Sequence, residues 1–299
     1  MFNAFVQECA GAIFAKLSAE TLGLVSVGVS AGGLVATMLH ILLIAVNADE
    51  LTLGFISLLV GTVVSLGLIP MTYGLTRNSY FRSFKTSLTH QEQISHRISL
   101  TQDKDVCLSA WKYYLTLLIT LTSTLMIAPT VTHLVEPQNP DKDSVWKTRY
   151  FMPVSCYLVY YVFEIVGKET ANITCEKMVG FVWWTSQKGQ WTLLIASVAR
   201  IAIIPLLLFC NIAPKTRSPE MPVVFGSVGW YIFFNAFFAL TKGYIQNIAF
   251  MYAPKVVGKD SQELASAFAM MVTLIGRAIG SLLALTLVKP LFGFRLKSF

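Results

Sequence analysis

Long apolar segments dominate the pattern of this chain. They cover residues 21–46, 52–75, 108–133, 150–172, 190–212, 224–252 and 262–288. At a rise of ~1.5 Å per residue, about 20 residues of helix cross a hydrocarbon core of about 30 Å. Backbone groups cannot stay unpaired in lipid, so we expect a transmembrane helix in each segment. A membrane β-barrel would instead show alternating segments of about 10 residues.

The polar stretches divide these segments into groups. Residues 1–14 are apolar but would give only about 21 Å of helix, so we expect either a cut span or an interfacial helix there. The longest polar stretch predicts a cytoplasmic linker. The expected organisation is a partial N-terminal bundle of three segments at 1–75, the first incomplete, a linker at 76–107, and a five-helix C-terminal bundle at 108–299. The predicted fold class is all-α polytopic membrane protein.

Composition supports a membrane protein and changes what the positive net charge implies. The chain has 299 residues, of which 55% are hydrophobic and 13% charged, against about 25% charged in soluble domains. A net charge of +7 in a soluble protein would suggest nucleic-acid binding. Here the Lys and Arg residues lie in short loops beside apolar segments, where they set membrane orientation. We therefore predict a lipid bilayer as the surroundings, no nucleic-acid partner, the linker inside and the C-terminus outside.

Motifs for catalysis and metal binding are not found in the sequence. It contains no HExxH, GxSxG, P-loop or GxGxxG pattern, and its five cysteines share no CxxC spacing. We interpret His90 and His96 as solvated linker residues rather than metal ligands. The sequence thus predicts that the protein is not an enzyme and has no cofactor, metal or disulfide framework.

Charged residues inside the apolar segments are the candidates for function, because burying charge in a membrane is costly. They are Glu8, Glu164, Lys168, Arg200, Lys242 and Arg277. Glu164 and Lys168 are four residues apart in the favoured order, so they share one helix face. They could line a polar cavity or form a helix-stabilising pair near the membrane boundary. Arg200 precedes Pro205, and it could be functional or could snorkel beside a kink.

Small and aromatic residues predict how the helices pack and where they meet the interface. Gly28, Gly32 and Gly33 cluster in one segment, and Gly276 and Gly280 form a GxxxG spacing typical of close helix contacts. The tryptophans near predicted segment ends indicate interfacial anchors. They are Trp183, Trp184, Trp191 and Trp230.

Three sequence blocks carry a resemblance to a known family. The stretch RYFMPVSCYLVYYVFEIVGK at 149–168 resembles the eighth helix of equilibrative nucleoside transporters, with its RYFxPVSC opening and FDxxGR motif. Residues 199–211 look like their ninth helix. Trp230, Gly243-Tyr244 and Ala253-Pro254-Lys255 look like their tenth helix and the loop after it. The blocks follow the family order.

The N-terminal part resembles the same family. Val6-Gln7 is similar to the fourth helix, and the glycine-rich stretch at 30–34 is similar to the fifth. The chain would then correspond to helices four to eleven, with the first three absent. The resemblance implies helical bundles of the major-facilitator type, here N-terminally truncated, that rock around a central site by alternating access.

Site residues follow from the resemblance, position by position. It implies that Gln7 holds the nucleobase, while Glu164 and Lys168 hold the ribose hydroxyls. Glu8, Gly33 and Arg200 are candidates for supporting roles. The family aspartate is Glu164 here and the family arginine is Lys168; lysine lacks the planar fork of arginine, so substrate preference is expected to differ.

The expected function is facilitative transport of nucleosides, with nucleobases as a further candidate cargo. Two alternatives stay open. The chain could be a truncated, non-transporting product that acts as an interaction or regulatory subunit of a full-length transporter. It could also couple transport to protons through Glu8 or Glu164, since acids within membranes often carry protons. The family default implies the plasma membrane, with an organelle membrane still open.

Overall fold

The computed structural model describes residues 19–46, 50–77, 100–128, 130–136, 145–176, 183–212, 222–258 and 261–291. Each predicted apolar segment contains helix, which confirms the all-α class. The helices are α2 (Ala19–Ala45), α3 (Glu50–Arg77), α5 (Leu100–Ile127), α6 (Val159–Glu176), α8 (Gln187–Ala199), α9 (Ile203–Leu208), α10 (Val228–Tyr252) and α11 (Gln262–Leu291). The short segment at 1–14 and most of the linker lie outside the described residues.

Short 3-10 and π-helical segments precede, join or follow several of these helices. Two π-helical segments, Trp146–Tyr150 and Met152–Leu158, lead into α6. A 3-10 turn at Arg200–Ala202 joins α8 to α9, and Pro254–Val256 forms another after α10. A further 3-10 turn at Thr132–Leu134 follows α5, and isolated β-bridges pair Val135 with Ile212 and Cys210 with Phe225. Helix α5 ends at Ile127, because the residue before Pro129 is disfavoured in helical conformation.

Several helices are long and apolar enough to cross a membrane. Within the described residues these candidate spans are Gly23–Ala45, Val106–Leu134, Gln187–Leu208 and Leu264–Leu287. Many large apolar side chains on them face outward, such as Leu42, Ile195 and Leu282 at more than 60% exposure. An outward apolar surface of this kind fits lipid rather than water. The protein is an integral multi-pass membrane protein.

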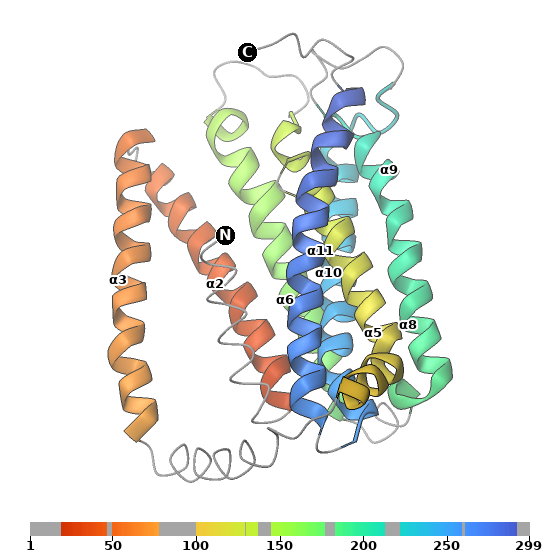
Figure 1. Ribbon diagram of the computed structural model, residues 1–299. Coiled ribbons are helices and arrows are strands. Elements are labelled where there is room, and N and C mark those ends of the chain that lie inside the picture. The colour runs from red at the N-terminus through yellow and green to blue at the C-terminus, as the bar shows by residue number, and fades with distance from the viewer. Residues whose placement is uncertain are drawn as a thin grey trace. The chain divides into compact units, whose positions relative to one another are not determined.

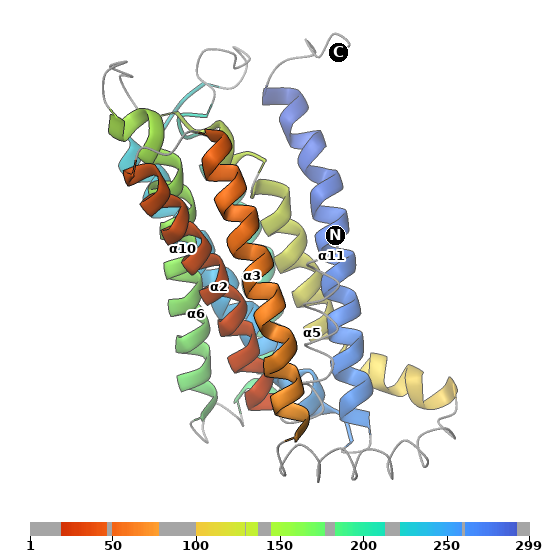
Figure 2. The same ribbon diagram turned by 90° about the vertical axis from the view of Figure 1, so that its left-hand side faces the viewer.

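The chain forms two compact units, Met38–Asp105 and a larger one made of Met1–Thr37 with Val106–Phe299. In the larger unit, α6 runs alongside α10 (Figures 1 and 2). Helix α11 packs on α5, where a side chain at Gly276 or Gly280 would meet the backbone of Leu118 or Thr122. The predicted GxxxG contact is therefore confirmed. The smaller unit contains α3 and the last residues of α2.

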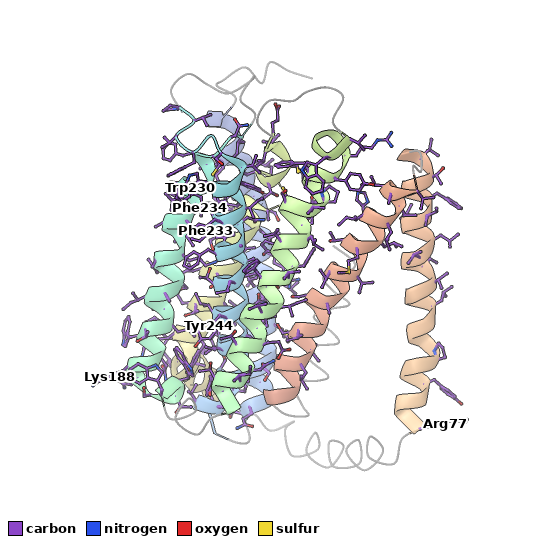
Figure 3. All side chains as sticks on the ribbon, turned by 180° about the vertical axis from the view of Figure 1, so that it is seen from behind. Arg77, Lys188, Trp230, Phe233, Phe234 and Tyr244 are labelled. Carbon is purple, nitrogen blue, oxygen red and sulfur yellow. The ribbon has the colours of Figure 1, made fainter. Side chains whose placement is uncertain are left out.

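Aromatic residues gather at both ends of the larger unit. Trp230, Phe233 and Phe234 cluster near the start of α10, at the opposite end from Lys188 on α8 (Figure 3). Trp111 of α5 and Trp191 near the start of α8 pack edge-to-face. Trp183, Trp191 and Trp230 are exposed, as interfacial anchors should be. The same expectation was wrong for Trp184, which is buried because it packs against Tyr244 in the core of the unit; its backbone carbonyl also accepts a hydrogen bond from Tyr113.

Candidate functional site

Helix α6 enters the site through a stretch of wide turns. Pro153 lies inside the second π-helical segment and has no N–H to donate. The carbonyls of Ser155 and Cys156 accept hydrogen bonds from Asn235 Nδ2 of α10, at 3.3 and 2.9 Å. Asn235 thus provides a hydrogen-bond donor to two buried backbone carbonyls. This contact fixes the segment that leads into α6 against α10, about two turns before Glu164.

Glu164 and Lys168 form a buried ion pair on one face of α6. The Lys168 Nζ to Glu164 Oε1 distance is 2.9 Å, and both side chains are nearly inaccessible. The predicted pairing is therefore confirmed. At ~1.5 Å per residue, about 18 Å of helix separates Glu164 from the end of α6 at Glu176. The pair lies deep within the helical unit rather than near the end of its helix.

Helix α2 supplies neutral partners to this pair. Ser30 Oγ donates to Glu164 Oε1 at 2.8 Å and accepts from Lys168 Nζ at 2.6 Å. Lys168 Nζ also donates to the carbonyl of Ser26 at 2.6 Å, one turn earlier on α2. An ammonium has three N–H bonds, and Ser30 Oγ, the Ser26 carbonyl and Glu164 Oε1 together use all of them. Lys168 therefore clamps α2 to α6.

Helix α10 contributes a second cation, Lys242. Its Nζ lies 2.6 Å from Glu164 Oε1 and 5.4 Å from the centre of the Tyr160 ring. One carboxylate thus faces two ammonium groups. We call Ser26, Ser30, Glu164, Lys168 and Lys242 the polar cluster.

A pair of glycines brings α6 and α10 close enough for this contact. A Cβ on Gly167 would collide with the backbone oxygen of Leu240, and a Cβ on Gly243 would collide with that of Glu164. The two helices therefore touch backbone to backbone at the level of the polar cluster. Gly243 directly follows Lys242, so the close approach also sets where the Lys242 ammonium can reach.

Polar side chains continue along the same face of α6 beyond Lys168. Asn247 of α10 donates to the Lys168 carbonyl at 3.1 Å and to Asn172 Oδ1 at 2.7 Å. Asn172 is one turn after Lys168, and Gln246 of α10 is also buried. Asn172 Nδ2, Asn247 Oδ1 and Gln246 Oε1 are buried without a hydrogen-bond partner within the described residues. Polar atoms in this state are suited to water or a polar ligand.

The structure contradicts one of the two sequence interpretations of Arg200, snorkelling beside a kink. It is buried in the 3-10 turn between α8 and α9, so it does not snorkel. Its guanidinium donates to the carbonyls of Thr120 and Phe238 and to the hydroxyls of Ser123 and Thr241. It also stacks on the Phe238 ring at 3.7 Å. None of its hydrogen bonds reaches Glu164 or Lys168.

The remaining predicted residues fall partly outside the described chain. Gln7 and Glu8 both lie there. Gly33 faces α6, where a Cβ would meet the ring of Tyr161. Gly33 is thus next to the polar cluster, about one turn from Ser30 on α2.

The polar cluster has the chemistry of a reversible hydrogen-bonding site. Ser30, Lys168 and Lys242 all reach Oε1 of Glu164, and no described residue bonds its second oxygen, Oε2. A carboxylate oxygen of this kind accepts hydrogen bonds from hydroxyl groups. The cluster is made of groups from α2, α6 and α10, so small movements of these helices would change it.

Comparison with known proteins decides the family. A family model described as Nucleoside transporter matches residues 1–289. The chain belongs to the nucleoside transporter family. This confirms the family resemblance and fits a transport protein rather than an enzyme.

Named relatives agree with this membership. The chain is 33% identical over 160 residues to human "Equilibrative nucleoside transporter 1", which covers 54% of this chain and 32% of that protein. The mouse protein of that name is 32% identical over 186 residues, 62% of this chain and 37% of that protein. Human "Equilibrative nucleoside transporter 2" is 25% identical over 175 residues, 58% of this chain and 35% of that protein. The matched part spans about a third of each relative's length.

Sequence reasoning named Lys242 among the charged candidates but gave it no partner or role, and it did not include Ser26 or Ser30 among the site residues. Ser26 carries no signal, because its contribution is a backbone carbonyl. Lys242 does carry one: it has no acidic residue three or four positions away on its own helix. A buried lysine without a partner on its own helix needs one on another helix, and Glu164 was available.

Proposed function

We propose that this chain carries out facilitative transport of nucleosides across a membrane by alternating access. Family membership supports transport, and the printed names of its relatives support a nucleoside cargo. The observation that carries the proposal is the buried Glu164 carboxylate, held between α2 and α10 with Oε2 unbonded by any described residue. Nucleobases are a second candidate cargo.

In this proposal each predicted site residue has a defined task. Glu164 accepts from the sugar hydroxyls, and Lys168 holds Glu164 and α2 in place for that contact. Gln7 holds the nucleobase, and Glu8 stands beside it. Gly33 leaves room next to Tyr161, and Arg200 supports the site by joining the helices around it. Hydrogen bonds of this kind are reversible, as a transporter that releases its cargo requires.

Facilitative transport is favoured over the alternatives. The relatives are named equilibrative transporters, which supports movement down a gradient over proton coupling. Transport family membership also favours transport over a purely regulatory role. We place the protein in the plasma membrane in this proposal.

The proposal predicts that Glu164 is needed for transport. Glu164→Gln keeps the shape of the side chain but removes the charge that faces two lysines, so we expect uptake of radiolabelled adenosine to fall at least tenfold. A hydrogen bond to a charged group contributes about 1.5–3 kcal/mol, which corresponds to such a factor. Uptake is measured in transport-deficient cells at matched surface expression, with Glu169→Gln on the same helix as the control.

Binding is measured separately, so that loss of transport and loss of the site can be told apart. Adenosine should raise the melting temperature of the purified protein and should do so less for Glu164→Gln. Uptake and stabilisation that are both unchanged in Glu164→Gln would rule out the assigned role. Stabilisation without uptake in the unsubstituted chain would instead support the non-transporting alternative.

A further inference from the structure

The two lysines of the polar cluster differ in how many of their hydrogen-bond donors are in use. Lys168 Nζ has three acceptors within 2.9 Å: Glu164 Oε1, Ser30 Oγ and the Ser26 carbonyl. An ammonium has three N–H bonds, so Lys168 has none left for a ligand. Contact with a sugar would require it to give up a bond to α2 or to Glu164.

Lys242 has donors to spare. Among the described residues its one hydrogen-bond acceptor is Glu164 Oε1, at 2.6 Å, and the Tyr160 ring lies on one side of it. As far as the described residues go, two of its three N–H bonds remain for another acceptor. Its side chain is 13% exposed, against 2% for Lys168 and 3% for Glu164. Of the three charged groups, Lys242 is the one that a ligand can most readily approach.

The net charge of the polar cluster also distinguishes Lys242 from Lys168. If Lys242 is removed, Glu164 and Lys168 still form a neutral pair, so Lys242 is not needed to neutralise the carboxylate. Keeping an additional cation in a buried cluster has a desolvation cost. Arg277 of α11 adds to the positive potential at Lys242. Because Lys242 is buried despite this cost, we expect it to bind a further group in addition to Glu164.

We propose that Lys242 is a further ligand-binding residue and that it, rather than Lys168, donates to the sugar of the cargo. One sugar hydroxyl donates to Glu164 Oε2 while it or its neighbour accepts from Lys242 Nζ. A vicinal diol can make both bonds at once, so Lys242 selects for ribose over sugars that lack these hydroxyls. Lys168 is then a positioning residue that fixes Glu164. This inference rests on the proposed nucleoside transport.

The test compares adenosine with 2′,3′-dideoxyadenosine, which lacks both hydroxyls. We expect the unsubstituted chain to prefer adenosine in uptake competition and in thermal stabilisation. Lys242→Met should reduce that preference roughly tenfold, the usual effect of losing a hydrogen bond to a charged group. Lys242→Arg should restore most of it, because it returns a cationic donor. Lys188→Met removes an exposed lysine in the first turn of α8 and should leave the preference unchanged (Figure 3).

Each result has a distinct meaning. A lysine with a purely structural role would lower uptake of both compounds equally, so an unchanged preference in folded Lys242→Met overturns the inference. Loss of preference in Lys168→Met but not in Lys242→Met would also overturn it and assign the sugar to Lys168. If Lys242→Met fails to fold, the same comparison is made with Lys242→Gln.

The Glu164 variant separates failure of this inference from failure of the proposed function. Normal uptake by Glu164→Gln would contradict the proposed function itself. Loss of uptake in Glu164→Gln together with an unchanged preference in the Lys242 variants would contradict this inference alone.

Discussion

Arg200 is a buried charge whose hydrogen-bond partners are all neutral. Two carbonyls, two hydroxyls and the face of Phe238 surround the guanidinium. The planar fork suits this arrangement, because Nε, Nη1 and Nη2 can donate in different directions from one rigid group. The carbonyls belong to α5 and α10, and Arg200 itself lies between α8 and α9. One side chain therefore ties three parts of the unit together.

We expect Arg200→Lys to destabilise the protein while leaving cargo preference intact. Lysine keeps the charge but cannot reach both carbonyls and both hydroxyls from a single nitrogen. Buried acceptors left without donors cost about 1–3 kcal/mol each. The melting temperature in detergent should drop clearly, and the ratio of adenosine to dideoxyadenosine binding should stay the same.

The matched control at this scale is Arg77→Lys. Arg77 is exposed at the end of α3 and bonds the Tyr73 hydroxyl, a contact that lysine can also make. Its melting temperature should be within error of the unsubstituted protein. A preserved melting temperature in Arg200→Lys, or a changed sugar preference, would show that Arg200 acts on the cargo rather than on packing.

At the scale of elements, the contact between α6 and α10 places the charged groups. Gly167 and Gly243 face the partner helix's backbone, which cannot move aside as a side chain could. Any added Cβ must push the helices apart. Lys242 and Glu164 come from opposite sides of this contact, so their 2.6 Å pair depends on it.

We predict that Gly167→Ala and Gly243→Ala each lower both stability and adenosine binding. Overpacking a close helix contact costs typically about 1–3 kcal/mol. Separation of the helices would also lengthen the Lys242 to Glu164 distance and weaken the site. Melting temperature and adenosine-induced stabilisation measure the two effects on the same sample.

Gly28→Ala provides the comparison. A Cβ at Gly28 of α2 would meet nothing within 4 Å, and alanine is the better helix former. This variant should be as stable as the unsubstituted protein or more so. Equal behaviour of Gly28→Ala and Gly167→Ala would mean that close approach of α6 and α10 is not required.

The sequence predicts the helices well because length and hydrophobicity decide them. The segment predicted at 224–252 became α10 at Val228–Tyr252, and the one at 262–288 became α11 at Gln262–Leu291. Helix α5 begins at Leu100, before the apolar segment predicted from 108. The apolar pattern missed these first turns because their residues are polar. The π-helical turns before α6 were not foreseen, since their hydrogen bonds depend on Asn235 from a distant helix.

The site was predictable only where its geometry is local. Glu164 and Lys168 are one turn apart, so their pairing follows from helix periodicity. Lys242 meets Glu164 through a contact between α6 and α10, and the sequence does not say which faces of two helices meet. Trp184 was misjudged for the same reason: its neighbour Trp183 is exposed, and only packing against Tyr244 distinguishes them.

At the scale of the whole molecule, orientation in the membrane depends on loop charge. Placing the basic linker inside puts Lys188 on the cytoplasmic face, and the start of α10 on the opposite face. Trp230 and Lys188 do lie at opposite ends of the larger unit (Figure 3). Basic residues are slightly more numerous on the linker side, and the orientation that they set decides from which side cargo meets Lys242.

Cysteine labelling tests this orientation directly. Val224 lies just before α10 and is exposed, as is Lys188 at the start of α8. In intact cells a membrane-impermeant maleimide should label Val224→Cys above the background of the native cysteines, whereas Lys188→Cys should gain label only after permeabilisation. Cys156, Cys175 and Cys210 are buried, so they should add little background. Labelling of Lys188→Cys in intact cells and of Val224→Cys only after permeabilisation would place the linker outside. Both positions belong to the larger unit, so a reversed orientation would reverse both results.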